Sequence, residues 1–85
     1  MTDASPELEQ QVRESFARFE QGRMFQGCKV AEDERGTVVR IYSQSTQSPR
    51  VLPTPYQIFR FDRSDGTLSL LTGDDAAPYV IKIYK

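Results

Sequence analysis

The residues of this chain that could carry chemistry are few, because histidine is absent and cysteine occurs once, at Cys28. Without histidine, the chain lacks the usual general base for a serine or cysteine nucleophile and lacks imidazole metal ligands. Two carboxylates held in a cleft would support acid–base catalysis, but the acidic residues fall on a predicted helix surface or in turns. Asp74 and Asp75 have no third metal ligand nearby. We therefore expect a non-enzymatic protein without a metal or cofactor.

Cys28 has two interpretations. Lys29 follows it directly, and a neighbouring cation favours the reactive thiolate form. A lone cysteine in a predicted strand is more often a small buried residue, and the chain has no histidine to activate it. We favour the buried interpretation and keep a reactive thiol at Cys28 as the alternative.

The composition describes a small protein with nearly balanced charge. The chain has 85 residues, with 11 Lys and Arg against 12 Asp and Glu. One domain is expected at this length. Nucleic-acid-binding domains are typically basic, so this balance argues against a general polyanion binder. No stretch approaches the roughly 20 apolar residues of a membrane helix, and the polar start has no signal-peptide pattern. We expect a cytoplasmic protein that does not insert into membranes.

Residues 5–21 have the pattern of an amphipathic helix. Ser5 is a favoured N-cap, and Pro6 occupies the first helical position, where its missing N–H costs nothing. Gly22 is expected to cap the other end. Residues 1–4 are expected to be disordered. The apolar stripe of the helix consists of Leu8, Val12, Phe16 and Phe19.

After Gly22 the apolar period changes from 3.6 to 2, which predicts strands. The expected strands are residues 24–31, 37–43, 56–62, 67–72 and 79–84. The predicted fold is α+β, with one N-terminal helix packed on a five-stranded antiparallel β-meander, and it forms one domain over residues 5–85.

The connection at residues 44–55 is expected to be long and exposed. Connections in compact domains are usually about 4–6 residues, and longer ones are often functional. The candidate binding residues of this loop are Pro49, Arg50, Pro53 and Pro55.

Alternation along the strands divides the predicted sheet into two faces. The face expected to meet the helix carries Val39, Ile41, Phe59, Phe61, Leu68, Leu70, Ile81 and Ile83. The opposite face mixes aromatic, aliphatic and basic groups: Val38, Arg40, Tyr42, Tyr56, Ile58, Arg60, Val80, Lys82 and Tyr84. Because one helix cannot cover both faces, we expect this second face to be exposed.

The exposed face predicts a protein-binding module, such as an adaptor, regulator or assembly factor. Tyrosine and arginine are enriched at interface hot spots. The predicted partner-binding residues are Arg40, Tyr42, Tyr56, Ile58, Arg60, Lys82 and Tyr84. An ordinary solvated sheet face with tyrosines packed across strands is the plain alternative.

Two other partners are compatible with the same surface. Open sheets with stacking aromatics and nearby arginines bind single-stranded nucleic acid, although the overall charge is unfavourable and the sequence has no glycine-aromatic RNA-binding motif. A meander also leaves two strand edges, so a homodimer through a sheet edge or face is the other arrangement.

Overall fold

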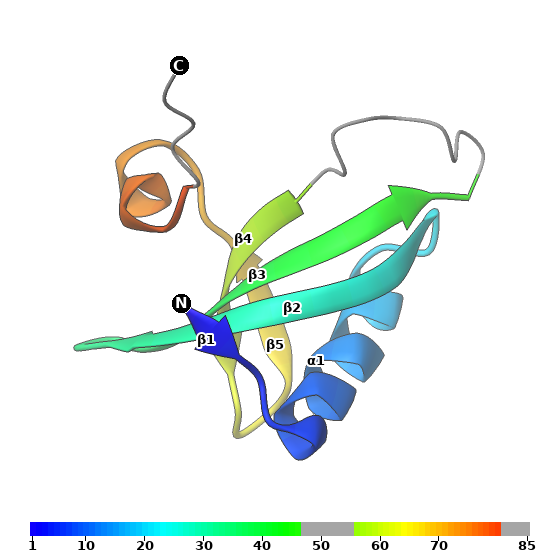
Figure 1. The fold of residues 1–85 in the computed structure, drawn as a ribbon, viewed down its shortest axis with the longest axis horizontal. Helices are drawn as coiled ribbons and strands as arrows, with labels where there is room; N and C mark the ends of the chain where they lie inside the picture. The colour runs from blue at the N-terminus through cyan, green and yellow to red at the C-terminus, as the bar shows by residue number, and fades with distance from the viewer. Residues whose placement is uncertain (47–55, 81–85) are drawn as a thin grey trace.

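The structure, a computed structural model, describes residues 1–46 and 56–80 of the chain. Five antiparallel strands form one sheet in sequential order, and one helix packs against it (Figure 1). The predicted α+β meander is therefore confirmed. The strands are β1 (Thr2–Asp3), β2 (Arg23–Asp33), β3 (Gly36–Ser45), β4 (Tyr56–Asp62) and β5 (Thr67–Leu70).

Helix α1 spans Pro6–Phe19 and starts where the sequence predicts. The Ser5 Oγ accepts a hydrogen bond of 3.2 Å from the Leu8 backbone N–H, which satisfies one of the free donors at the helix start. The apolar stripe packs on the sheet, because side chains three or four residues apart lie on the same side of a helix. Its buried members are Leu8, Val12 and Phe16.

The end of α1 differs from the prediction. The helix stops at Phe19, and Glu20 already has an extended backbone (φ −146°, ψ 116°). The Glu20 N–H donates to the Phe16 carbonyl at 2.9 Å, so the last turn closes without a left-handed residue. The predicted C-cap at Gly22 is therefore wrong, because the chain has turned toward β2 before it reaches this glycine.

The N-terminal strand was not expected. Thr2 and Asp3 pair with Val30 and Lys29 on the outer edge of β2, and the Lys29 ammonium also forms an ion pair with the Asp3 carboxylate. These contacts tie residues 2–3 to the sheet, so the predicted disorder of residues 1–4 does not hold there. A two-residue strand is too short to show the alternation by which strands are found in a sequence.

The chain after β5 also differs from the prediction. It forms two short 3-10 helices, η1 (Gly73–Asp75) and η2 (Ala77–Tyr79), in place of the start of a strand at Tyr79. Pro78 favours the turn, because its ring fixes φ and it has no N–H to donate to a strand neighbour. Residues 81–84 of the predicted strand lie outside the described residues.

The β2–β3 hairpin is longer than expected. Its strands meet at the Asp33–Gly36 pair, which leaves only Glu34 and Arg35 in the turn. Gly36 has a φ of +122°, a backbone conformation that residues other than glycine rarely adopt. Because β3 continues to Ser45, the predicted connection at 44–55 begins later, and residues 47–55 lie outside the described residues.

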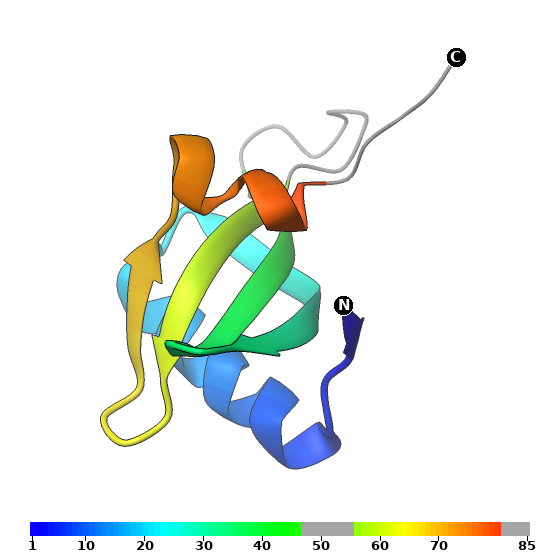
Figure 2. The same ribbon diagram turned by 90° about the vertical axis from the view of Figure 1, so that its left-hand side faces the viewer.

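Other elements lie against both faces of the sheet, although the second face is covered only in part (Figure 2). Helix α1 covers one face, and there the predicted core is confirmed for Val39, Ile41, Phe59, Phe61 and Leu68, which are all buried. The predicted burial of Leu70 is wrong, because this residue at the end of β5 is 48% exposed. Residues 71–80, which we call the C-terminal cap, cross the other face. A second cluster lies beneath this cap and consists of Val38, Ile58 and Ala76, with Tyr56, Leu71 and Tyr79 packed against it.

The face predicted to be exposed is therefore partly closed. Val38 is completely buried and Ile58 is 4% exposed, so the expectation of an open apolar surface around Ile58 is wrong. The inference that one helix cannot cover both faces was sound, but the chain supplies a second cover from its own C-terminal segment. Burying these two aliphatic side chains contributes roughly 1.5–3 kcal/mol each, and this free energy favours the closed position of the cap.

A pair of phenylalanine substitutions tests the packing of α1. Phe16 is 1% exposed and Phe19 is 46% exposed, although the Phe19 ring lies 5.0 Å from the Phe59 ring. We expect Phe16→Ala to lower the free energy of unfolding by about 3–5 kcal/mol or to prevent folding. Phe19→Ala should cost about 1 kcal/mol, because half of its surface already faces water. Urea denaturation followed by circular dichroism measures both, and equal losses would contradict this packing.

Candidate functional site

Three of the predicted partner-binding residues meet at one end of the sheet. Tyr42 on β3 is directly opposite Tyr56 on β4, and their rings are 6.0 Å apart. The Arg40 Cζ atom lies 5.5 Å from the centre of the Tyr42 ring and 5.7 Å from that of Tyr56. All three side chains are half-buried. We call this group the Arg–Tyr cluster.

The charge of Arg40 has no counter-ion in the part of the chain that the structure describes. Its Nη1 donates to the Tyr79 carbonyl oxygen at 3.1 Å, while its buried Nε has no hydrogen-bond partner. No carboxylate of residues 1–46 or 56–80 lies within 4.0 Å of this guanidinium. An arginine that contacts aromatic rings and a carbonyl but no carboxylate can bind an anionic group.

Arg60 lies on the same face but is already paired. Its Nη1 and Nη2 donate to the two carboxylate oxygens of Asp33 at 2.8 and 2.9 Å. The Tyr79 hydroxyl donates to Asp33 Oδ2 at 2.7 Å, and the Arg35 N–H donates to Oδ1 at 2.8 Å. These bonds, with the Arg60 contact contributing most, hold the pKa of the Asp33 carboxyl well below its usual range. Arg60 is therefore not a free cation for a partner.

Asp33 is not among the predicted site residues, because it falls in the turn that follows the predicted strand at residues 24–31. The signal was present in the alternation, since Lys29, Ala31 and Asp33 share one side of β2. Lys29 and Ala31 are opposite Arg40 and Val38, so one further step places Asp33 on the face of the cap. Continuing the strand by two residues would have found the partner of Arg60.

The remaining predicted binding residues are divided between buried and undescribed positions. Ile58 is buried beneath the cap and does not belong to the accessible surface. Val80 at the end of the cap is 43% exposed. The positions that lie outside the described residues are Pro49, Arg50, Pro53, Pro55, Lys82 and Tyr84.

Cys28 is buried on the helix side of the sheet. The pKa of its thiol is raised to about 11, mainly by burial and also by the charge of Glu9, while Arg13 opposes both. Lys29 does not activate it, because adjacent strand residues point to opposite faces and the Lys29 ammonium pairs with Asp3. This placement agrees with the buried interpretation, and the reactive-thiol alternative stays a prediction for the labelling experiment below.

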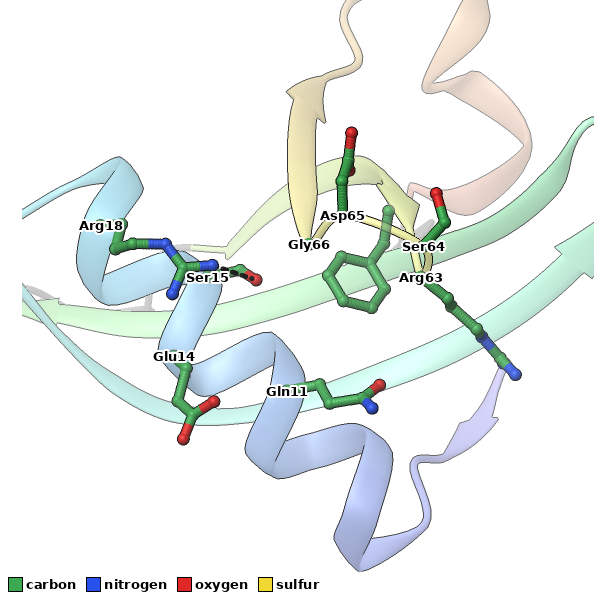
Figure 3. Close-up of a pocket in the computed structure, with 9 residues that line it drawn as sticks. Gln11, Glu14, Ser15, Arg18, Arg63, Ser64, Asp65 and Gly66 are labelled. Atoms are coloured by element: carbon green, nitrogen blue, oxygen red, sulfur yellow. Dashed lines mark hydrogen bonds between the residues drawn. The ribbon is translucent and has the colours of Figure 1, made fainter.

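A groove lies on the helix side, between α1 and the β4–β5 turn (Figure 3). Its volume is about 210 Å³. The Arg18 Nη2 is 3.4 Å from the Ser15 Oγ at one end, while the Arg63 side chain points away from them (Figure 3) and pairs with Glu32. The charged groups do not converge on a common point, so the groove defines no binding site by itself.

Gly66 lines this groove beside the helix, and its backbone conformation leads to a specific prediction. It has φ of +75°, and a Cβ atom there would lie 3.0 Å from Ser15 Oγ and 3.1 Å from Arg18 Nη2. Gly66→Ala should therefore cost about 1–3 kcal/mol of unfolding free energy. Gly22→Ala is the matched control, because its φ is not positive and nothing lies within 4 Å. Thermal denaturation compares the two, and equal melting temperatures would contradict the turn geometry.

Comparison of the chain with protein-family models, curated proteins and solved structures finds no match. Within residues 1–46 and 56–80, no group of three or more cysteine or acidic side chains is placed to hold a metal ion. No helix of this part is both long and apolar enough to cross a bilayer. Any assignment of function therefore depends on the Arg–Tyr cluster and its surroundings.

The raised pKa of the Cys28 thiol predicts that the folded protein is alkylated slowly at this residue. A pKa of about 11 leaves roughly a hundredfold less thiolate at pH 8 than an ordinary thiol has, since each pKa unit is a factor of ten. We expect iodoacetamide to label the folded protein at least about a hundredfold more slowly than the urea-unfolded chain. Mass spectrometry gives both rates, and Cys28→Ser is the blank. Comparable rates would show that the thiol is accessible and ionised.

Proposed function

We propose that this protein is a small, non-enzymatic protein-binding module, and that the Arg–Tyr cluster is the centre of its docking surface. The observation that carries the proposal is the state of Arg40. This guanidinium lies against two tyrosine rings, has a buried Nε without a partner and has no carboxylate beside it in the described structure. Tyrosine and arginine grouped in this way are typical of interface hot spots.

The chemistry of the cluster indicates the kind of segment that would bind. A planar guanidinium recognises a carboxylate through paired hydrogen bonds. The half-buried rings of Tyr42 and Tyr56 offer apolar area beside this charge. We therefore propose a protein partner that presents an aspartate or glutamate next to an apolar or aromatic side chain.

Single-stranded nucleic acid is the alternative ligand for the same cluster, since bases stack on tyrosines. The charges around the cap make it the weaker candidate. Asp33 neutralises Arg60, and Asp74 and Asp75 lie beside this pair in a surface hollow. A phosphate backbone requires several accessible cations, and on the described part of this face Lys29 and Arg60 are already paired with acids.

A homodimer through the β2 edge is also less favoured. Thr2 and Asp3 already occupy this edge at Val30 and Lys29, and the pairing of β2 with β3 is irregular between Phe25 and Gly27. A bulge of this kind bends a strand and discourages edge pairing. Sedimentation equilibrium at micromolar to millimolar concentration measures the oligomeric state directly.

Selection from a random peptide library tests the proposed function. We expect the wild-type protein to enrich peptides with an acidic residue beside an apolar one. Arg40→Gln and Tyr42→Ala should each weaken the binding of such a peptide about tenfold or more, as hot-spot substitutions do. Arg40→Lys should recover little, because an ammonium lacks the planar paired donors.

Arg35→Gln is the matched control for charge. Arg35 is exposed at the hairpin tip, and no described carboxylate pairs with it, so its loss should leave peptide affinity unchanged. Equal weakening by Arg35→Gln and Arg40→Gln would contradict a site at the cluster. Binding of an oligonucleotide at 50 mM salt that falls steeply at higher salt would favour the nucleic-acid alternative.

A further inference from the structure

The C-terminal cap is held to the sheet mainly by one residue. Tyr79 donates its hydroxyl to Asp33 Oδ2 at 2.7 Å, and its carbonyl oxygen accepts from Arg40 Nη1 at 3.1 Å. Its ring packs against the Val38 and Ile58 cluster. Two functional groups of one residue thus connect the cap to the hairpin tip and to the Arg–Tyr cluster.

The cap itself buries little. Of residues 71–80, only Ala76 is buried, and Leu71 and Tyr79 are half-buried. Helix α1 on the opposite face buries three large apolar side chains and a serine. Segments with little buried apolar surface open at lower free energy than the rest of a domain. The cap is therefore suited to open while the helix and the central strands stay folded.

The surface beneath the cap continues the docking surface without interruption. Along β3 and β4, three residue pairs lie side by side on this face: Val38 with Arg60, Arg40 with Ile58, and Tyr42 with Tyr56. The last pair is half-buried beside the cap, and Val38 and Ile58 are covered by it. Opening the cap would extend the Arg–Tyr cluster into a ladder of aromatic, aliphatic and cationic groups. It would also release Arg40 Nη1 from the Tyr79 carbonyl.

We propose that the C-terminal cap is an autoinhibitory cover that competes with the protein partner for this face. The inference rests on the proposed function and adds its regulation. In the closed state Tyr79 occupies Arg40 and the cap shields Val38 and Ile58. The partner binds the open state more tightly, so it shifts the population toward opening. The apparent affinity then scales with the fraction of molecules in which the cap is open.

Two neighbouring acids provide a matched pair of variants. Asp33→Asn removes the charge that holds Arg60 and Tyr79 but keeps an oxygen to accept from the Arg35 N–H. Glu32→Gln makes the same chemical change one residue earlier. Glu32 instead contacts Arg63 and Thr37, and adjacent strand residues point to opposite faces. Tyr79→Phe is a third variant, which removes only the hydroxyl.

Native-state hydrogen exchange measures the opening of the cap without any ligand. The reporters are the amides of Leu71, Ala76 and Tyr79, which donate to Ile58, Gly73 and Ala76 respectively. Asp33→Asn and Tyr79→Phe should each speed exchange of these amides about fivefold, which is the scale expected for a partly exposed ion pair or a bond to it. Amides in β3 and α1 should be unaffected, and Glu32→Gln should match the wild type.

Peptide binding supplies the second measurement. If the cap competes with the partner, the same two variants should bind the selected peptide more tightly, by the same factor as their exchange increases. Glu32→Gln should again match the wild type. Cap amides that exchange only with global unfolding would overturn the proposal. Faster cap exchange with unchanged or weaker peptide affinity would overturn it as well.

Failure of the proposed function would produce a different result. In that case Arg40→Gln would bind the selected peptide as tightly as the wild type does, whatever the exchange rates of the cap amides. Arg40→Gln also separates the two roles of this arginine, because it loosens the cap through Tyr79 while it removes the ligand contact. Its expected phenotype is therefore faster cap exchange combined with weaker peptide binding, whereas Asp33→Asn combines faster exchange with tighter binding.

Discussion

The structure depends on one constraint, which is that the two central strands are apolar on both faces. Val38 and Val39 are adjacent on β3, as are Ile58 and Phe59 on β4, and all four are buried. Adjacent strand residues point in opposite directions, so each pair needs a cover on both sides. Helix α1 covers Val39 and Phe59. The chain must then return over the other face to shield Val38 and Ile58, and the cap does so with two short turns.

The cap also explains why so few charges remain available on this face. Arg60 looks like a surface cation in the sequence, but the closed cap and the hairpin tip place Asp33 against it. Two other cations are also paired with carboxylates, since Lys29 pairs with Asp3 and Arg63 with Glu32. Arg40 differs from these three cations, because its guanidinium contacts a carbonyl and two aromatic rings and its Nε has no hydrogen-bond partner in the described structure. A near-neutral chain can therefore still present one cation suited to an anionic partner.

Local signals predicted much of the fold because they act within a few residues. Ser5 caps α1 through its own side chain, and the stripe at Leu8, Val12 and Phe16 follows from helical spacing. The features that were missed depend on distant contacts. Two-residue β1 exists because Thr2 and Asp3 meet an open edge about 27 residues away. The alternating residues after Tyr79 resemble a strand, whereas the position of Tyr79 is determined by Asp33 and Arg40, which belong to other strands.

The candidate site shows the same division between local and distant causes. Tyr42 and Tyr56 were placed together correctly, because strand alternation and antiparallel pairing determine their positions. Their accessibility could not be predicted in this way, since it depends on how far the cap reaches. Ala76 packs over Val38 and Ile58, while the tyrosine pair, which follows Val38 on β3 and precedes Ile58 on β4, stays half-buried. The border between the core and the proposed docking surface is thus the edge of a segment that buries little apolar surface. For that reason a change at Asp33 or Tyr79, which lie outside the Arg–Tyr cluster, is expected to alter how much of the face the proposed partner meets.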